Sequence, residues 1–197
     1  MNGRGPGRPR GTSHAEIRDI ALELFLEQGY AATSLVSIAR AAGVSRTTLF
    51  AYFRTKRDII WADHDLRAAE IDHALDSGPA HPVVELIQRG LLVSAHYGVE
   101  EHAALAARMR LTEREDELRA YATLIAQDTS ERVLQGVIRR VPEADPAMIG
   151  LVSVALAAAA SRCLREWAHQ ERPVLPLEEH IAHGVRPLVE ALRPLLP

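Results

Sequence analysis

The sequence predicts an all-α protein with about nine helices, because apolar residues recur at the three- and four-residue spacing of an amphipathic helix. Alanine and leucine are abundant, whereas Phe, Trp and Tyr together make up only 5% of the residues, and this balance favours helix. We find neither the period-two alternation of β-strands nor an internal repeat. With 197 residues, the chain can bury a sizeable core in one or two domains.

Charge divides the chain into two unequal parts. Residues 1–57 contain nine basic and four acidic residues, a net charge of +5, whereas residues 58–197 contain fourteen and twenty-two, a net charge of −8. All basic residues are arginines except Lys56. A basic first part on an acidic remainder is typical of one polyanion-binding domain attached to a body that does not bind nucleic acid.

Residues 1–12 are too rich in glycine and proline to fold alone, and we expect a disordered basic arm. Within it, Gly7-Arg8-Pro9-Arg10-Gly11 resembles an AT-hook, a short segment whose arginines lie in the narrow minor groove of A·T-rich DNA. In that case Arg8 and Arg10 contact DNA, as the N-terminal arms of other helix-turn-helix proteins do. The alternative is a basic tail that adds only non-specific attraction to phosphates.

The first helix is predicted over residues 14–28. Ser13 is its N-cap, and Glu16 follows three residues later, which is the pattern of a capping box. The helix ends at Gly29, and we expect Tyr30 to pack in the following loop. Its core-facing stripe consists of Ile17, Ile20, Ala21, Leu24 and Phe25.

Residues 33–57 predict two short helices joined by a tight turn. Thr33 or Ser34 caps the first helix, which runs to about Ala42 with an apolar stripe at helical spacing. Gly43 suits the left-handed backbone of the turn. Ser45 then caps a second helix over 45–52. Leu49, Phe50 and Phe53 supply its apolar surface, and we expect Leu49 and Phe53 to lie in the core. Two helices with a glycine turn form a helix-turn-helix, whose second helix lies in the DNA major groove.

The stretch A-A-G-V-S-R-T-T-L-F-x-Y-F-x-x-K, beginning at Ala41, resembles the DNA-binding domain of TetR-family transcriptional regulators. The resemblance covers residues 13–60. It implies a helix-turn-helix domain over 13–57 and a helical ligand-binding and dimerisation domain over 58–197. It also implies a cytoplasmic homodimer, acting as a repressor, that binds a near-palindromic double-stranded operator and responds to a small effector.

Arg46 is the predicted reader of bases, because its guanidinium can bond O6 and N7 of guanine together. Thr47 and Thr48 could touch a thymine methyl, a base edge or a phosphate. By the resemblance, Tyr52 and Lys56 contact phosphates, and the family commonly has Tyr where this chain has Phe50, which loses one possible phosphate bond. The alternative for each polar residue is ordinary solvated helix surface. The complete predicted DNA-binding set is Arg8, Arg10, Thr33, Ser45, Arg46, Thr47, Thr48, Phe50, Tyr52 and Lys56.

The body is predicted to be helical throughout. A run of small residues, Ala155–Ala160, lets two helices approach closely, and by the resemblance the last two helices form a four-helix dimer interface. Pro187 predicts a kink or a break in the last helix. The expected helices cover residues 55–76, 82–98, 100–111, 113–140, 146–170 and 177–195.

The body also resembles, more loosely, a TetR branch whose C-terminal domain binds acyl-CoA-like ligands and that includes regulators linked to the mycofactocin system. Arg108-Met109-Arg110-Leu111, the long helix over 113–140 and Trp167 carry this resemblance. Arginine forks suit phosphate groups. The alternative is that both arginines pair with the acidic run 113–117 and that the tryptophans are core. The predicted ligand-binding residues are Trp61, Arg108, Arg110, Tyr121 and Trp167.

Other functions receive little support from the sequence. His180 and His183 lack further metal ligands, and no His-Glu-x-x-His, phosphate-loop, dinucleotide or Gly-x-Ser-x-Gly motif is present. We therefore predict no enzyme activity, metal or cofactor. The longest apolar run, 152–160, is too short for a membrane span, no secretory signal begins the chain, and Cys163 is alone. An architectural DNA-binding dimer without an effector is the alternative function.

Overall fold

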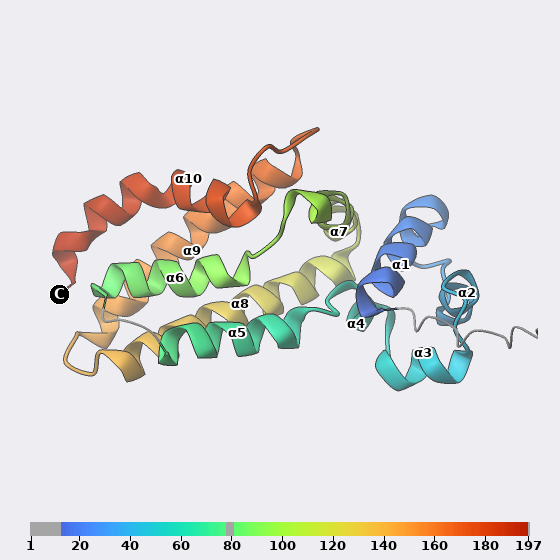
Figure 1. The fold of residues 1–197 in the computed structure, drawn as a ribbon, viewed down its shortest axis with the longest axis horizontal. Coiled ribbons are helices and arrows are strands. Elements are labelled where there is room, and N and C mark those ends of the chain that lie inside the picture. Colours follow the sequence, from blue (N-terminus) through green and yellow to red (C-terminus); the bar gives the residue numbers. More distant parts are fainter. Residues whose placement is uncertain (1–12, 78–80, 197) are drawn as a thin grey trace, which may run out of the picture. The chain divides into compact units, whose positions relative to one another are not determined.

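The computed structural model describes residues 13–77 and 81–196, and every regular element among them is a helix. The predicted all-α fold class is therefore confirmed. The described residues form ten α-helices and two 3₁₀ turns, compared with the nine helices that we expected. The chain divides into two compact units with the boundary between Ala62 and Asp63 (Figure 1).

The first unit contains four helices around a small apolar core. Ile17, Phe25, Ile38, Leu49 and Ile59 are all fully buried in it. Ser13 and Glu16 form the predicted capping box, in which each residue's side chain accepts a hydrogen bond from the other's backbone N–H. The helices are α1 (His14–Gln28), α2 (Leu35–Ala41), α3 (Arg46–Tyr52) and α4 (Lys56–Ile60).

The turn between α2 and α3 follows the prediction. Gly43 has a φ of 66°, in the region where a side chain is disfavoured. The N–H of Val44 donates to the carbonyl of Ala39 at 3.0 Å, which closes the end of α2. Ser45 then caps α3 by accepting a hydrogen bond from the N–H of Thr48. The turn geometry thus follows from local residue types.

The second unit is a bundle in which α5, α6 and α8 run alongside one another, and α9 and α10 pack together and against α6 (Figure 1). Its core is mostly aliphatic, and the fully buried Trp167 is its largest member. The elements are α5 (His64–Asp76), α6 (Val83–Ser94), the 3₁₀ turn η1 (Val99–Glu101), α7 (His102–Arg114), α8 (Asp116–Arg140), α9 (Pro146–Ala168), α10 (Leu177–Leu192) and the 3₁₀ turn η2 (Arg193–Leu195).

Glycines allow α8 to approach its neighbours closely. A Cβ added at Gly90 of α6 would lie 3.0 Å from both γ-carbons of Val133, and one at Gly136 of α8 would lie 2.5 Å from a methyl of Leu75. Real Cβ atoms rarely come this close to another carbon. The small residues therefore set the spacing of α5, α6 and α8.

Two expected helices were wrong in extent. The helix predicted over 55–76 is interrupted by a turn at 61–63, and α6 ends at Ser94 instead of residue 98. Asp63, in the turn, and Tyr97, just after α6, are joined by a hydrogen bond from the Tyr97 hydroxyl to the Asp63 carboxylate. Pro187 lies inside α10 without ending the helix, which continues to Leu192, so the predicted break is not present. The missing N–H of the proline costs this helix one backbone hydrogen bond.

Helix α9 has a strongly apolar composition. This helix of 23 residues is long and apolar enough, by length and composition alone, to cross a membrane. We had considered only the shorter run 152–160, which is too short for a span. Core helices of soluble proteins have the same properties, and α9 packs against α6, α8 and α10. Its outer face nevertheless exposes Leu151 and Val154. This face leaves apolar surface uncovered in the single chain.

Candidate DNA-binding surface and effector region

Helix α3 is anchored on one side and exposed on the other. Leu49 is completely buried and Phe53 nearly so, as predicted. Arg46, Thr47 and Phe50 are exposed on the same short helix. The anchored side fixes the orientation of the exposed one, which is the arrangement that a recognition helix requires.

Two aromatic residues contribute to the exposed surface of α3. Phe50 is 40% exposed and Tyr52 is 53% exposed. The guanidinium of Arg46 lies 5.2 Å from the centre of the Phe50 ring, one helical turn away. This cation–π contact limits where the Arg46 side chain can lie.

Tyr52 contacts a residue of α1 that no sequence pattern singled out. The ring of His14, the first residue of α1, meets the ring of Tyr52 edge-on at 4.6 Å and also lies 5.1 Å from that of Phe53. Because His14 and Tyr52 are far apart in the chain, no local pattern indicates this contact. His14 orients the phenol that the resemblance assigns to a phosphate.

Hydroxyl groups at the start of α3 are engaged with each other. The Oγ of Ser45 accepts from the Thr48 N–H at 3.0 Å and lies 2.7 Å from the Thr48 hydroxyl. Ser45 is exposed, and Thr48 is half-buried. Their first role is to cap the helix, and a phosphate contact would use the remaining lone pairs or protons of these hydroxyls.

Two other predicted residues have structural partners. Thr33 is only 2% exposed, and its hydroxyl donates to the carbonyl of Gly29 at 2.8 Å, so the prediction that it contacts DNA does not fit the structure. The ammonium of Lys56 donates to the carbonyl of Tyr30 and lies 4.1 Å from the centre of its ring. An ammonium has three protons, so Lys56 can also bind a phosphate. Arg8 and Arg10 lie outside the described residues.

In the second unit, Arg108 belongs to a buried ionic network instead of pairing with the acidic run 113–117. Its guanidinium lies 3.6 Å from the carboxylate of Asp63 and donates to the hydroxyl of Tyr97 at 3.1 Å. Tyr97 donates to Asp63 at 2.6 Å, and Arg67 donates to the same carboxylate oxygen at 3.1 Å. The side chains of the two arginines and Asp63 are each at most 16% exposed. We call these four residues the Asp63 network.

The network stabilises the charged form of Asp63. Burial by itself would raise the pKa of this carboxyl, but the charge of Arg108, the hydrogen bond from Tyr97 and the charge and hydrogen bond of Arg67 lower it to about 2. Asp63 is therefore ionised throughout the physiological pH range.

The other predicted ligand-binding residues differ in burial. Trp167 is fully buried and donates from its indole nitrogen to the carbonyl of Leu175 at 2.8 Å, so it is a core residue. Trp61 is also buried. Arg110 is exposed, and Tyr121 is half-buried on α8. For the tryptophans, the structure supports the alternative role as core residues.

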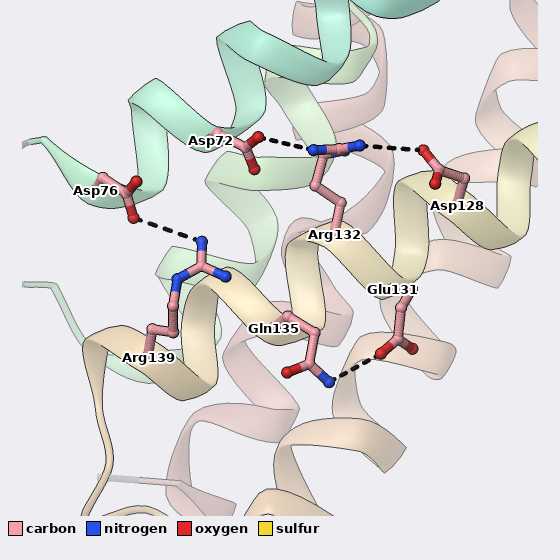
Figure 2. A pocket seen from close by; sticks show the side chains of 7 residues that line it. All are labelled: Asp72, Asp76, Asp128, Glu131, Arg132, Gln135 and Arg139. Atoms are coloured by element: carbon pink, nitrogen blue, oxygen red, sulfur yellow. Dashed lines mark hydrogen bonds and ion pairs between the residues drawn. The ribbon is translucent and has the colours of Figure 1, made fainter.

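A groove of about 450 Å³ lies on the surface between α5 and α8 (Figure 2). Arg132 bridges Asp72 of α5, at 2.7 Å, and Asp128 of its own helix, at 3.6 Å. This charged lining does not suit an acyl chain, and none of the five predicted ligand-binding residues belongs to it. The lining consists of Asp72, Asp76, Asp128, Glu131, Arg132, Gln135 and Arg139.

Comparison with known proteins agrees with this architecture. Residues 17–62 match the family described as bacterial regulatory proteins of the tetR family, and residues 81–193 match the MftR C-terminal domain. The mycofactocin biosynthesis transcriptional regulator MftR of Mycobacterium tuberculosis is 33% identical over 135 residues, which is 68% of each chain. The fatty acid metabolism regulator protein of Bacillus subtilis is 24% identical over 109 residues, 54% of this chain and 56% of that one.

A solved structure shares the fold. FadR of Thermus thermophilus, a TetR-family repressor crystallised in complex with lauroyl-CoA, aligns with a TM-score of 0.54 at 23% identity, covering 90% of this chain and 94% of its own. The fold and the helix-turn-helix surface define a DNA-binding transcriptional regulator. The chain belongs to the TetR family, and its C-terminal part is of the MftR type.

Proposed function

We propose that this regulator is a cytoplasmic repressor whose homodimer binds a near-palindromic operator through two copies of α3. The observation that carries this proposal is the exposed surface of α3: Arg46, Thr47, Phe50 and Tyr52 are exposed on a helix that the buried Leu49 anchors. Arg46 reads a base, whereas Tyr52 and Lys56 bind phosphates and set the register of the protein on DNA. Thr33 is not part of this proposed surface.

The uncovered face of α9 supports the homodimer. Leu151 and Val154 are 67% and 69% exposed, although the helix that carries them is the most apolar long helix among the described residues. A symmetric contact between two copies of this face would cover it. Two-fold symmetry of the protein matches the two half-sites of a near-palindromic operator.

We further propose that a small hydrophobic effector, of the acyl-CoA type, releases the repressor from DNA. The fatty-acid-related relatives support this class of ligand. Helix α8 offers such a ligand an apolar side chain that the body leaves open: Leu124 is 59% exposed and lies in a stretch where no residue between Leu118 and Val133 is buried. Tyr121 and Arg110 remain proposed contacts of this effector.

Fluorescence anisotropy with DNA from around the protein's own gene tests the DNA-binding part. Arg46→Ala should relax the preference for one operator base pair, at a cost of about 1–3 kcal/mol. Lys56→Ala should weaken binding to all sequences and lower the salt slope by about one unit. Arg114→Ala, which removes an exposed arginine from the body, is the control and should change neither. Identical effects of the first two variants would contradict their separate roles.

The same assay with lauroyl-CoA, CoA and laurate tests the effector. Release by lauroyl-CoA alone would support the acyl-CoA class. Specific DNA binding that is indifferent to all three compounds would favour the alternative, an architectural DNA-binding dimer without a small effector, for which the charged α5–α8 groove and the buried tryptophans offer some support.

A further inference from the structure

The Asp63 network lies at a special point of the chain. Asp63 directly precedes α5, and only Trp61 and Ala62 separate it from the end of α4 at Ile60. Its carboxylate is therefore the first side chain of the second unit to be held by that unit's own residues. The backbone that joins the two units therefore runs directly into this residue.

The partners of Asp63 come from three separate parts of the second unit. Arg67 is on the next turn of α5, Tyr97 is in the loop after α6, and Arg108 is in the middle of α7. Tyr97 is central, because its hydroxyl donates to Asp63 and accepts from Arg108, while its ring lies 3.8 Å below the Arg67 guanidinium. A movement of α7 therefore reaches Asp63 through short, directional bonds.

We propose that Asp63, Tyr97 and Arg108 are positioning residues for DNA binding: together they set the start of α5 and, through it, the placement of α3 on the operator. None of them touches DNA in this proposal. This inference rests on the proposed operator binding and adds to it the residues that transmit the state of the body. In a dimer, a small shift at this junction changes the distance between two recognition helices, which must match the half-site spacing.

The hydrogen bonds of the Asp63 network favour a specific link between α7 and the start of α5 over a general contribution to packing. Desolvated ionic hydrogen bonds are directional, and losing one partner leaves the others unsatisfied. Another ion pair that ties α5 to a neighbouring helix, Asp72–Arg132, is shorter, at 2.7 Å, than either ion pair of Asp63, and its side chains are about twice as exposed. It lies more than two turns further along α5, away from the junction. This pair provides a matched control.

The test compares operator binding by Tyr97→Phe and Arg132→Gln in the full-length protein, at one protein concentration and with circular dichroism and thermal unfolding recorded for each. Tyr97→Phe keeps the ring under Arg67 and removes only the hydroxyl. We expect it to weaken operator binding about five-fold while the circular dichroism spectrum stays that of the wild type. Arg132→Gln should lower thermal stability about as much as Tyr97→Phe does. It should leave the operator affinity unchanged.

A double variant identifies the route. If Tyr97 acts through Asp63, then Asp63→Asn combined with Tyr97→Phe should weaken binding no further than the stronger single variant. Wild-type affinity in Tyr97→Phe, or an equal loss in Arg132→Gln, would overturn the inference and leave the proposed operator binding intact. Failure of the wild type itself to bind any DNA from around its gene would overturn both.

Discussion

Replacing Asp63 by asparagine removes the charge that compensates Arg67 and Arg108 while preserving the shape of the side chain. The pKa of Asp63 is lowered from 3.8 to about 2 in the folded protein. A shift of this size corresponds to roughly 2 kcal/mol of folding free energy at neutral pH, since one unit is about 1.4 kcal/mol. We therefore expect Asp63→Asn to destabilise the protein by about 2 kcal/mol at pH 7.

The dependence of this loss on pH gives a sharper test. Because the pKa is lower in the folded protein than in the unfolded chain, folding favours the ionised carboxyl, and the stabilisation is complete above about pH 5. It decreases as the pH falls through the unfolded value toward the folded one. At pH 3 about half of it should remain. The difference between wild type and Asp63→Asn should therefore narrow on the acid side.

Urea unfolding followed by circular dichroism measures this difference. Each protein is unfolded at pH 7, 5, 4 and 3, at one fixed protein concentration, because dimer stability depends on concentration. Taking the difference between the two proteins cancels the titration of the other carboxyl groups. Asp72→Asn, which removes a more exposed carboxyl of α5, should cost less than about 1 kcal/mol. A loss for Asp63→Asn that stays constant from pH 5 to pH 3 would refute the assigned pKa shift.

Further predictions concern packing and assembly. Gly90→Ala should destabilise the body by about 1–3 kcal/mol, because the new methyl meets both γ-carbons of the buried Val133 at 3.0 Å. Gly150→Ala, with no atom within 4 Å of the new methyl, should instead stabilise α9 by about 0.5–1 kcal/mol; thermal unfolding of both variants checks the pair, and equal effects would contradict the packing argument. Leu151→Glu on the exposed face of α9 should shift the dimer toward monomer in sedimentation velocity, whereas Leu124→Glu on the exposed part of α8 should not; a dimer that tolerates Leu151→Glu would argue against the α9 interface.

The sequence alone was sufficient where structure depends on neighbouring residues. The Ser13–Glu16 capping box, the Gly43 turn and the Ser45 cap were all predicted, and all are present. Helix caps and positive-φ glycines are decided within a few residues, so their signals are local. The apolar spacing of α3 likewise identified Leu49 and Phe53 as its buried side.

Tertiary structure decided the features that depend on residues distant in the chain. Bonds among Asp63, Tyr97 and Arg108 lie at two places where the predicted helices end, the interruption between α4 and α5 and the loop after α6, and they give Arg108 its partners. Helical spacing continues through residues 55–76, so no pattern in that stretch marks the break. The bonds that outweigh helical continuity there come from a loop and a helix more than thirty residues away. Helix propensity is a sum of weak local preferences, and a buried charge such as that of Asp63, which needs partners, overrides it.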